Sequence, residues 1–295
     1  MGKKSESISL VLGSGGARGH AHIGVIRALE ERKLSIRSIA GASMGAVVGG
    51  IYAAQELDTY IKWVMQLRKS DVVKLLDFSF TRTSIFKGER IIEVLRDLIG
   101  DKKIEDLPIS FTAVATAIEE QREIWLNDGS LFSAIRASTA VPGVFSPVTI
   151  DGRMLVDGGL VNPIPIAPTM NDATDLTIAV NLSGTKEHRR PAKKKSTEKP
   201  DDDDEGYRAA IGRFVSGLLE GGDEAKSVPG AVDLLIKSID VMQGSIARLK
   251  LAAYAPDIVI DIPRDACGFF EFHRAEEMAD LGYQNATAAL DSARL

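Results

Sequence analysis

The chain has 295 residues, of which 44% are hydrophobic and 26% charged, and its net charge is −5. This composition excludes fibrous and wholly disordered proteins, and the negative charge argues against general attraction to nucleic acid or to an anionic membrane. The single cysteine, Cys267, excludes a disulfide within the chain and a thiolate metal cluster, and it fits a reducing compartment. We expect one globular domain over residues 1–295, because α/β folds often exceed 200 residues as a single unit.

The N-terminal segment indicates neither export nor lipidation. The apolar run Ile8 to Leu12 is too short for a signal peptide and runs directly into glycines. The sixth position, where the myristoylation pattern has Ser or Thr, is Glu6. No segment approaches the roughly 20 apolar residues that span a bilayer. We therefore expect a cytoplasmic protein, with peripheral contact to a membrane as a hypothesis.

The first 54 residues predict a parallel α/β sheet. A short β-prone run over 8–12 ends in a glycine loop, and a helix with apolar residues on one face follows. The same order is then repeated by a strand over 36–40, a tight turn, and an apolar helix over 46–54. Strand, loop and helix in alternation are typical of parallel sheets.

The remainder continues the mixed pattern. Residues 57–107 carry apolar side chains at helical spacing. Further strands are expected over 109–116, 122–126, 148–150, 154–156, 176–182 and 258–260, and further helices over 131–140, 207–253 and 276–290. Residues 184–206 have almost no apolar side chains, and basic residues there are followed by an acidic run, so we expect a mobile charged insert.

The first chemical motif is Gly41-Ala-Ser43-Met-Gly45, which fits G-x-S-x-G between a strand and a helix. A turn this tight exposes the central hydroxyl above the sheet edge, and the helix N-terminus behind it favours the negative charge that develops on an attacked carbonyl oxygen. Ser43 is thus a candidate nucleophile. The alternative is a helix N-cap between two packing glycines.

The second motif is the glycine loop over 13–19. Arg18 stands where a dinucleotide-binding loop needs its third glycine, and no acidic residue ends the second strand, so a nicotinamide cofactor is disfavoured. Successive glycines leave backbone N–H groups free to converge on one oxygen, as in an oxyanion hole. The alternative is a plain turn. Two roles are open for the Arg18 side chain: its charge is directed at a lipid phosphate, or the side chain holds the loop in its conformation.

A serine nucleophile needs a proton acceptor. Of the four histidines, His20 and His22 follow the glycine loop, His188 lies in the charged insert, and His273 stands late in the chain. A stronger candidate is Asp157, which ends a hairpin strand before Gly158-Gly159, provided that a partly apolar pocket raises its pKa. The alternative is an Asp that caps a turn.

Together these motifs resemble the patatin-like phospholipase family, and in particular its small bacterial single-domain members. The matching segments are Gly15-Gly-Ala-Arg-Gly19, Gly41–Gly45, Ala134–Ser138 with Pro142-Gly143, and Asp157-Gly-Gly159 with Asn162-Pro163. The resemblance covers roughly Ile8 to Leu182. It implies a three-layer α/β sandwich with a mainly parallel central sheet and a Ser–Asp dyad that needs no metal or cofactor.

On this resemblance, Ser43 attacks an ester carbonyl and Asp157 takes its proton. The N–H groups of Gly15, Gly16 and Ala17, or that of Arg18, stabilise the oxyanion, and water hydrolyses the acyl-enzyme.

The implied substrates are lipid acyl esters: phospholipids, lysophospholipids or neutral glycerides. Apolar side chains within 57–107 are expected either to line an acyl channel or to pack in the core, namely Trp63, Met65, Phe78, Phe80 and Phe86. An acyl thioesterase would use the same chemistry, and a non-catalytic lipid-binding protein would keep the fold. Whether the chain forms homo-oligomers stays open.

Overall fold

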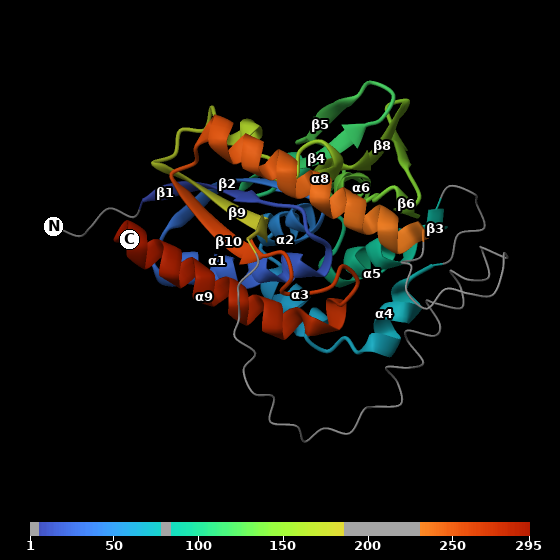
Figure 1. The fold of residues 1–295 in the computed structure, drawn as a ribbon, viewed down its shortest axis with the longest axis horizontal. Helices are drawn as coiled ribbons and strands as arrows, with labels where there is room; N and C mark the ends of the chain where they lie inside the picture. The colour runs from blue at the N-terminus through green and yellow to red at the C-terminus, as the bar shows by residue number, and fades with distance from the viewer. Residues whose placement is uncertain (1–5, 78–83, 186–230) are drawn as a thin grey trace, which may run out of the picture.

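The computed structural model describes residues 6–77, 84–185 and 231–295 (Figure 1). Its main sheet has the strand order β10-β9-β1-β2-β4-β8-β7, with β5 paired to β4. The five strands from β10 to β4 are parallel, and β5, β7 and β8 are paired antiparallel. The strands are β1 (Ser7–Leu12), β2 (Ser35–Ala42), β4 (Ser110–Ala117), β5 (Arg122–Leu126), β7 (Val148–Ile150), β8 (Arg153–Asp157), β9 (Leu176–Gly184) and β10 (Ile258–Pro263). The predicted mainly parallel α/β sheet is confirmed.

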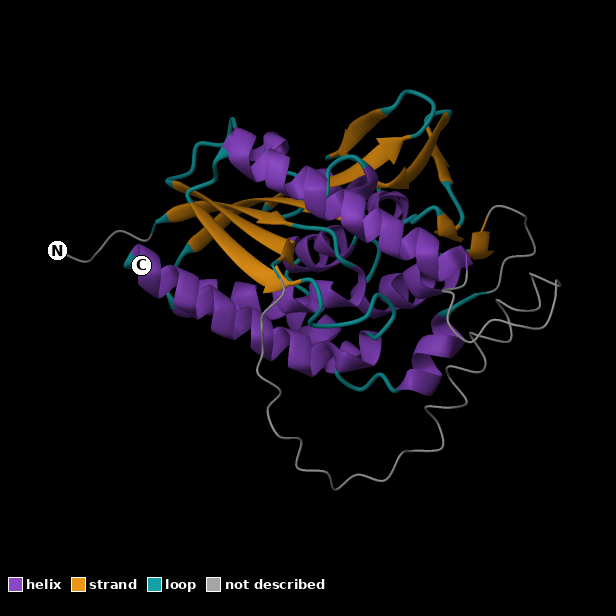
Figure 2. Cartoon of the chain, in the orientation of Figure 1, coloured by secondary structure: helices purple, strands orange, loops and turns teal. Residues whose placement is uncertain are grey.

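Helices cover both faces of this sheet (Figure 2). Alternate side chains of a strand point to opposite faces. Leu10 and Val180 belong to the large core with α1 (Ala21–Glu31), α2 (Met44–Ala53) and α9 (Ala275–Ala293). Val11 and Ala179 instead pack with Ala247 of α8 (Ala231–Tyr254). The sheet is therefore the middle of three layers.

The expected helical stretch over 57–107 contains α3 (Leu57–Val64), α4 (Lys69–Leu75), α5 (Glu89–Ile99) and the short 3-10 helix η2 (Ile104–Asp106). It also contains a strand that the apolar spacing did not predict, β3 (Ser84–Phe86). β3 pairs in parallel with β6 (Gly143–Phe145) to form a separate two-stranded sheet. A strand of three residues is too short to show a period, and its partner lies almost sixty residues later.

The other expected elements agree closely with the structure. The predicted helix over 131–140 is α6 (Leu131–Ser138), and the Asp151-Gly152 hairpin joins β7 to β8. Short 3-10 helices add η1 (Gly16–His20), η3 (Gly158–Leu160), η4 (Ala167–Thr169) and η5 (Phe272–Arg274). The charged insert lies outside the described residues except for Gly184, which ends β9, and Thr185; of the helix expected over 207–253, only α8 is described. That residues 1–295 form a single domain stays a prediction.

The register of the central strands positions the site. β1 and β2 are parallel, with Leu12 opposite Gly41, so the glycine loop and the serine turn leave the sheet side by side. Loops at the carboxyl ends of parallel strands are where ligands bind in open α/β folds.

Candidate active site

Ser43 connects β2 to α2 in a backbone conformation that serine rarely adopts, with φ 54° and ψ −123°. Its flanking glycines are required by space. A Cβ on Gly41 would lie 2.4 Å from the carbonyl oxygen of Gly45, and one on Gly45 would lie 2.0 Å from that of Leu12. A non-glycine residue held at positive φ is a form of stored strain that occurs preferentially at functional sites.

The strained turn is anchored by Ser138, the last residue of α6. The Ser43 N–H donates to Ser138 Oγ at 2.9 Å, and the Ser138 hydroxyl donates to the carbonyl of Val114 at 2.6 Å. All three residues are buried. Ser138 thus satisfies a backbone donor that the turn would otherwise leave unpaired, and it ties the turn to β4.

Ser138→Ala is expected to lower kcat by about tenfold to a hundredfold with KM nearly unchanged, because a small misplacement of the nucleophile weakens the transition state more than substrate binding. The free energy of unfolding should fall by about 1–3 kcal/mol, since a buried N–H loses its acceptor. Steady-state kinetics and denaturant unfolding would measure both effects. Ser133→Ala, on the same helix but near its start, is the control, and equal kcat values for the two variants would contradict the positioning role.

Asp157 ends β8 and is buried. Its Oδ1 accepts the N–H of Gly159 at 2.7 Å, whereas within the described residues its Oδ2 is buried without a hydrogen-bond partner. Burial raises its pKa from 3.8 to about 7, although hydrogen bonding from the Ser43 side chain and from the Gly159 N–H lowers it. The Ser43 hydroxyl is therefore close to this carboxyl without meeting the geometry of a full hydrogen bond to it.

Among the described histidines, His20 and His22 are buried and hydrogen-bonded. Burial lowers the pKa of both His20 and His22 to about 4. Nε2 of His20 is paired with the Tyr60 hydroxyl at 3.1 Å, and that of His22 with the carbonyl of Gly13 at 2.9 Å. His273 lies on η5, and His188 is outside the described residues. The carboxyl of Asp157 is the titratable group beside the serine.

The glycine loop offers two of the expected N–H donors. Within the described residues, those of Gly15 and Gly16 donate to no acceptor, whereas the Ala17 N–H donates to the carbonyl of Phe269 at 3.0 Å. Gly16 has φ +56°, and a Cβ there would lie 2.7 Å from the Phe269 ring, so glycine is required.

The side chain of Arg18 fixes this loop. The guanidinium is buried and donates from Nε to the carbonyl of Gly15 at 3.1 Å and from Nη1 to that of Arg264 at 2.6 Å. Its Nη2 forms an ion pair with Asp240 of α8. With these partners Arg18 has the structural role, and its charge is not directed at a lipid phosphate.

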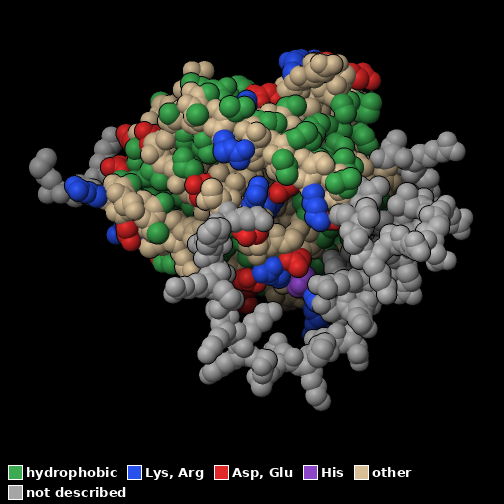
Figure 3. Space-filling view, in the orientation of Figure 1, with side chains coloured by type: hydrophobic (Ala, Val, Ile, Leu, Met, Phe, Trp, Pro, Cys, Tyr) green, Lys and Arg blue, Asp and Glu red, His purple; other side chains and the backbone are tan. Residues whose placement is uncertain are grey.

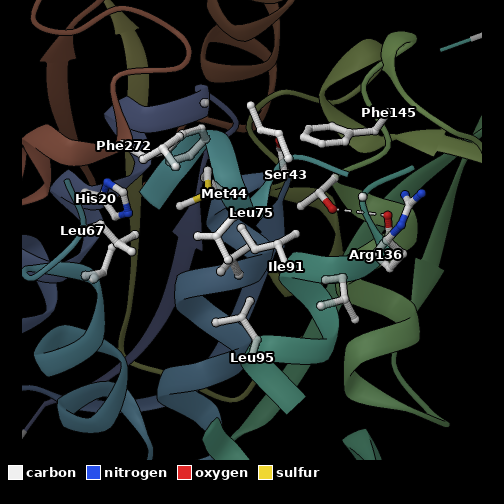
Figure 4. Close-up of a pocket in the computed structure, with 18 of the residues that line it drawn as sticks. His20, Ser43, Met44, Leu67, Leu75, Ile91, Leu95, Arg136, Phe145 and Phe272 are labelled. Carbon is white, nitrogen blue, oxygen red and sulfur yellow. Dashed lines mark hydrogen bonds between the residues drawn. The ribbon is translucent and has the colours of Figure 1, made fainter. Parts of the chain in front are cut away.

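A cavity with about 910 Å³ of empty space, open solvent at its mouth included, begins at Ser43 (Figure 4). Its walls are almost entirely apolar and come from α2, α3, α4 and α5, with Phe145, Phe269 and Phe272 adding aromatic rings. In Figure 4, Ser43 lies between Phe272 and Phe145, and Leu95 is the lowest of the labelled side chains. The serine therefore belongs to the lining of a largely apolar cavity.

Comparison with known proteins identifies the family. The family model of the patatin-like phospholipases matches residues 10–170. The chain belongs to the patatin-like phospholipase family. Uncharacterized NTE family proteins of Mycobacterium tuberculosis and Mycobacterium bovis are each 39% identical to this patatin-like chain over 99% of its length and 93% of their own. The resemblance seen in the sequence is thus confirmed.

One further relative and one solved structure also match the patatin-like chain. Neuropathy target esterase sws of Drosophila melanogaster is 33% identical over 60% of this chain and 13% of its own length. The crystal structure of VipD from Legionella pneumophila superposes with a TM-score of 0.47 and 15% identity, over 98% of this chain and 67% of that one.

The expected channel residues of this patatin-like chain are only partly those that line the cavity. Trp63 lines it, whereas Met65 packs against the main core and Phe86 belongs to a separate buried cluster. Phe78 and Phe80 lie outside the described residues. Among the helices of the described ranges, none has the length and apolarity needed to cross a membrane.

Proposed function

We propose that this chain is a serine acyl hydrolase that cleaves lipid acyl esters, phospholipids or lysophospholipids, through a Ser43–Asp157 dyad. The observation that carries the proposal is the placement of a strained, anchored serine beside a buried carboxyl and in the lining of a largely apolar cavity. An apolar cavity of this kind suits an acyl chain, and Ser43 in its lining suits attack on the ester carbonyl.

In the proposed acylation, the Asp157 carboxylate takes the proton of the Ser43 hydroxyl as Oγ bonds to the ester carbon. The N–H groups of Gly15 and Gly16 donate to the oxyanion. Asp157 then returns its proton to the leaving alcohol oxygen as the ester bond breaks. In deacylation, water attacks the acyl-enzyme, Asp157 takes a proton from that water, and Ser43 Oγ leaves and is protonated by Asp157.

Labelling with a fluorophosphonate lipid analogue tests the nucleophile. The native chain should gain the mass of one adduct, and Ser43→Ala should gain none. Ser9→Ala, which changes another buried serine, should be labelled like the native chain. Equal labelling of native and Ser43→Ala protein, or no labelling of folded native protein, would contradict the proposal and favour a lipid-binding protein without catalysis.

The proposed base predicts a pH dependence of kcat/KM in the free enzyme. Because the pKa of Asp157 is raised to about 7, kcat/KM should rise about tenfold per pH unit below about pH 6 and level off above about pH 8. A soluble short-chain ester is the substrate of choice, with folding checked at each pH. An inflection near pH 4 would point instead to an ordinary carboxyl or to one of the buried histidines.

The lining of the cavity predicts acyl-chain selectivity. Leu95 is buried and lines the cavity, so Leu95→Phe should reduce the space for the acyl chain and lower the ratio of kcat/KM for long-chain to short-chain esters by about tenfold. Leu98→Phe is the control, because Leu98 is on the same helix and packs against the core without lining the cavity. An unchanged ratio in Leu95→Phe would show that the acyl chain occupies another space.

A further inference from the structure

One face of α8 is exposed and apolar. Leu234, Val241, Met242 and Leu249 are 57%, 62%, 48% and 69% exposed, and their spacing of seven, eight and fifteen residues places them on one side of the helix. Leu235, 38% exposed, extends this outer face of α8. Five of the ten exposed large hydrophobic side chains of the described residues thus lie on a single helix.

The charges on this face are few and mostly basic. Asp233 and Lys237 form an ion pair near the start of α8. From Ser238 to the end of the helix, Arg248 is the one charged residue that is exposed. The exposed side of α9 is different, because it carries Glu276, Glu277, Asp280, Gln284 and Asp291. Water solvates that face readily, whereas the outer face of α8 presents an apolar stripe with a net positive charge.

The opposite side of α8 contacts the proposed active site. Ile239 is buried in a cluster that includes Phe145 and Phe269, two of the aromatic side chains that line the cavity. Asp240 forms the ion pair with Arg18 that fixes the glycine loop. A surface bound to the outer face of α8 would therefore lie one helix diameter from the site.

We propose that the outer face of α8 binds the surface of a lipid membrane or aggregate, an inference that rests on the proposed lipid-ester substrate. A helix with an apolar face and basic flanking residues lies in the interface of a bilayer with that face buried. Figure 3 shows hydrophobic side chains along the upper part of the molecule, where α8 crosses it, with Lys and Arg side chains among them. Arg248 complements an anionic lipid headgroup.

The test measures binding separately from turnover. Flotation with vesicles of phosphatidylcholine and phosphatidylglycerol would measure binding of two proteins that both carry Ser43→Ala. One has the native α8, and the other also carries Val241→Ser, Met242→Ser and Leu249→Ser. The triple replacement should weaken vesicle binding at least tenfold. Arg248→Glu should weaken binding to these vesicles more than to vesicles of phosphatidylcholine alone. Tyr283→Ser, on α9 in the layer across the sheet, is the matched control and should bind normally.

Hydrolysis of a soluble short-chain ester separates the two proposals. The triple variant with Ser43 intact should keep this activity within about twofold, which also shows that it is folded. If the native chain cleaves no ester yet binds vesicles through α8, the proposed function fails and the lipid surface stands. Unchanged vesicle binding by the triple variant would overturn the inference, as would a native dimer that the triple variant dissociates while neither binds vesicles.

Discussion

Asp157→Asn is expected to lower kcat by about 10²- to 10⁴-fold, because the variant has no group beside Ser43 that accepts its proton at neutral pH. The Asn side chain has nearly the same shape as the Asp side chain and keeps an oxygen that accepts the Gly159 N–H. The glycine loop and the cavity are left in place. Fluorophosphonate labelling should slow by a similar factor, whereas binding of a non-hydrolysable lipid should be unchanged.

The same variant should be more stable than the native chain at neutral pH. In the unfolded chain Asp157 ionises near its ordinary pKa of 3.8, whereas in the folded chain its pKa is about 7. The folded state thus binds the proton more tightly. The stability that the protonated Asp157 carboxyl contributes is fully present below pH 3.8 and is lost as the pH rises to about 7. Above that pH the native chain holds a buried carboxylate that Asn replaces.

Each unit of pKa elevation corresponds to about 1.4 kcal/mol, and burial of an amide offsets part of the gain, so we expect stabilisation on the order of 2 kcal/mol at pH 8. Thermal or denaturant unfolding between about pH 4.5 and pH 8 would measure it. The gain should shrink toward acid pH. A gain independent of pH, or a loss at pH 8, would show that the Asp157 carboxyl is not held at a raised pKa.

Gly24→Ala is expected to destabilise the fold by about 3 kcal/mol or more. Gly24 lies where α1 crosses α9, and a Cβ there would be 1.8 Å from the carbonyl oxygen of Ala279 and 2.5 Å from the backbone nitrogen of Tyr283. Backbone atoms cannot rotate away as a side chain can, so the two helices would have to separate.

Gly244→Ala makes the same chemical change, but we expect it to leave the free energy of unfolding unchanged or to raise it. On α8, a Cβ at Gly244 would lie 3.7 Å from Cβ of Ser183, which is ordinary van der Waals contact. Alanine favours the helix by up to about 1 kcal/mol over glycine. Denaturant unfolding of both variants would compare them directly. Similar losses in the two would mean that helix propensity, and not the close crossing of α1 and α9, decides the cost.

Features set by adjacent residues were predictable from the sequence. The serine turn, the hairpin at Asp151-Gly152 and the parallel strands each follow from local patterns of glycine and apolar residues, and the structure contains them. Asp157 was identifiable because a strand ends there before two glycines. Its raised pKa depends on burial by the surrounding layers, which no local pattern gives.

Features that depend on distant residues were not predictable. Ser138 lies 95 residues from the Ser43 N–H that it accepts, and the resemblance of Ala134–Ser138 to the family gave this serine no role. Arg18 was left between a substrate contact and a structural role, because its partner Asp240 is 222 residues away. The β3–β6 pair was missed for the same reason. The secondary-structure propensity of a segment follows from its own residues, whereas the partners of a residue or a strand depend on the assembled fold.

The partners of the glycine loop come from residues far along the chain. The loop spans residues 13–19, yet its side-chain and backbone contacts come from Asp240, Arg264 and Phe269, more than two hundred residues later. β1, which leads into it, lies between β2 and the much later β9. A nascent chain therefore carries Ser43 long before it can hold the loop beside it. A fragment that ends before Arg264 lacks the contacts of Arg264 and Phe269, so under the proposed function we expect it to be inert toward lipid esters.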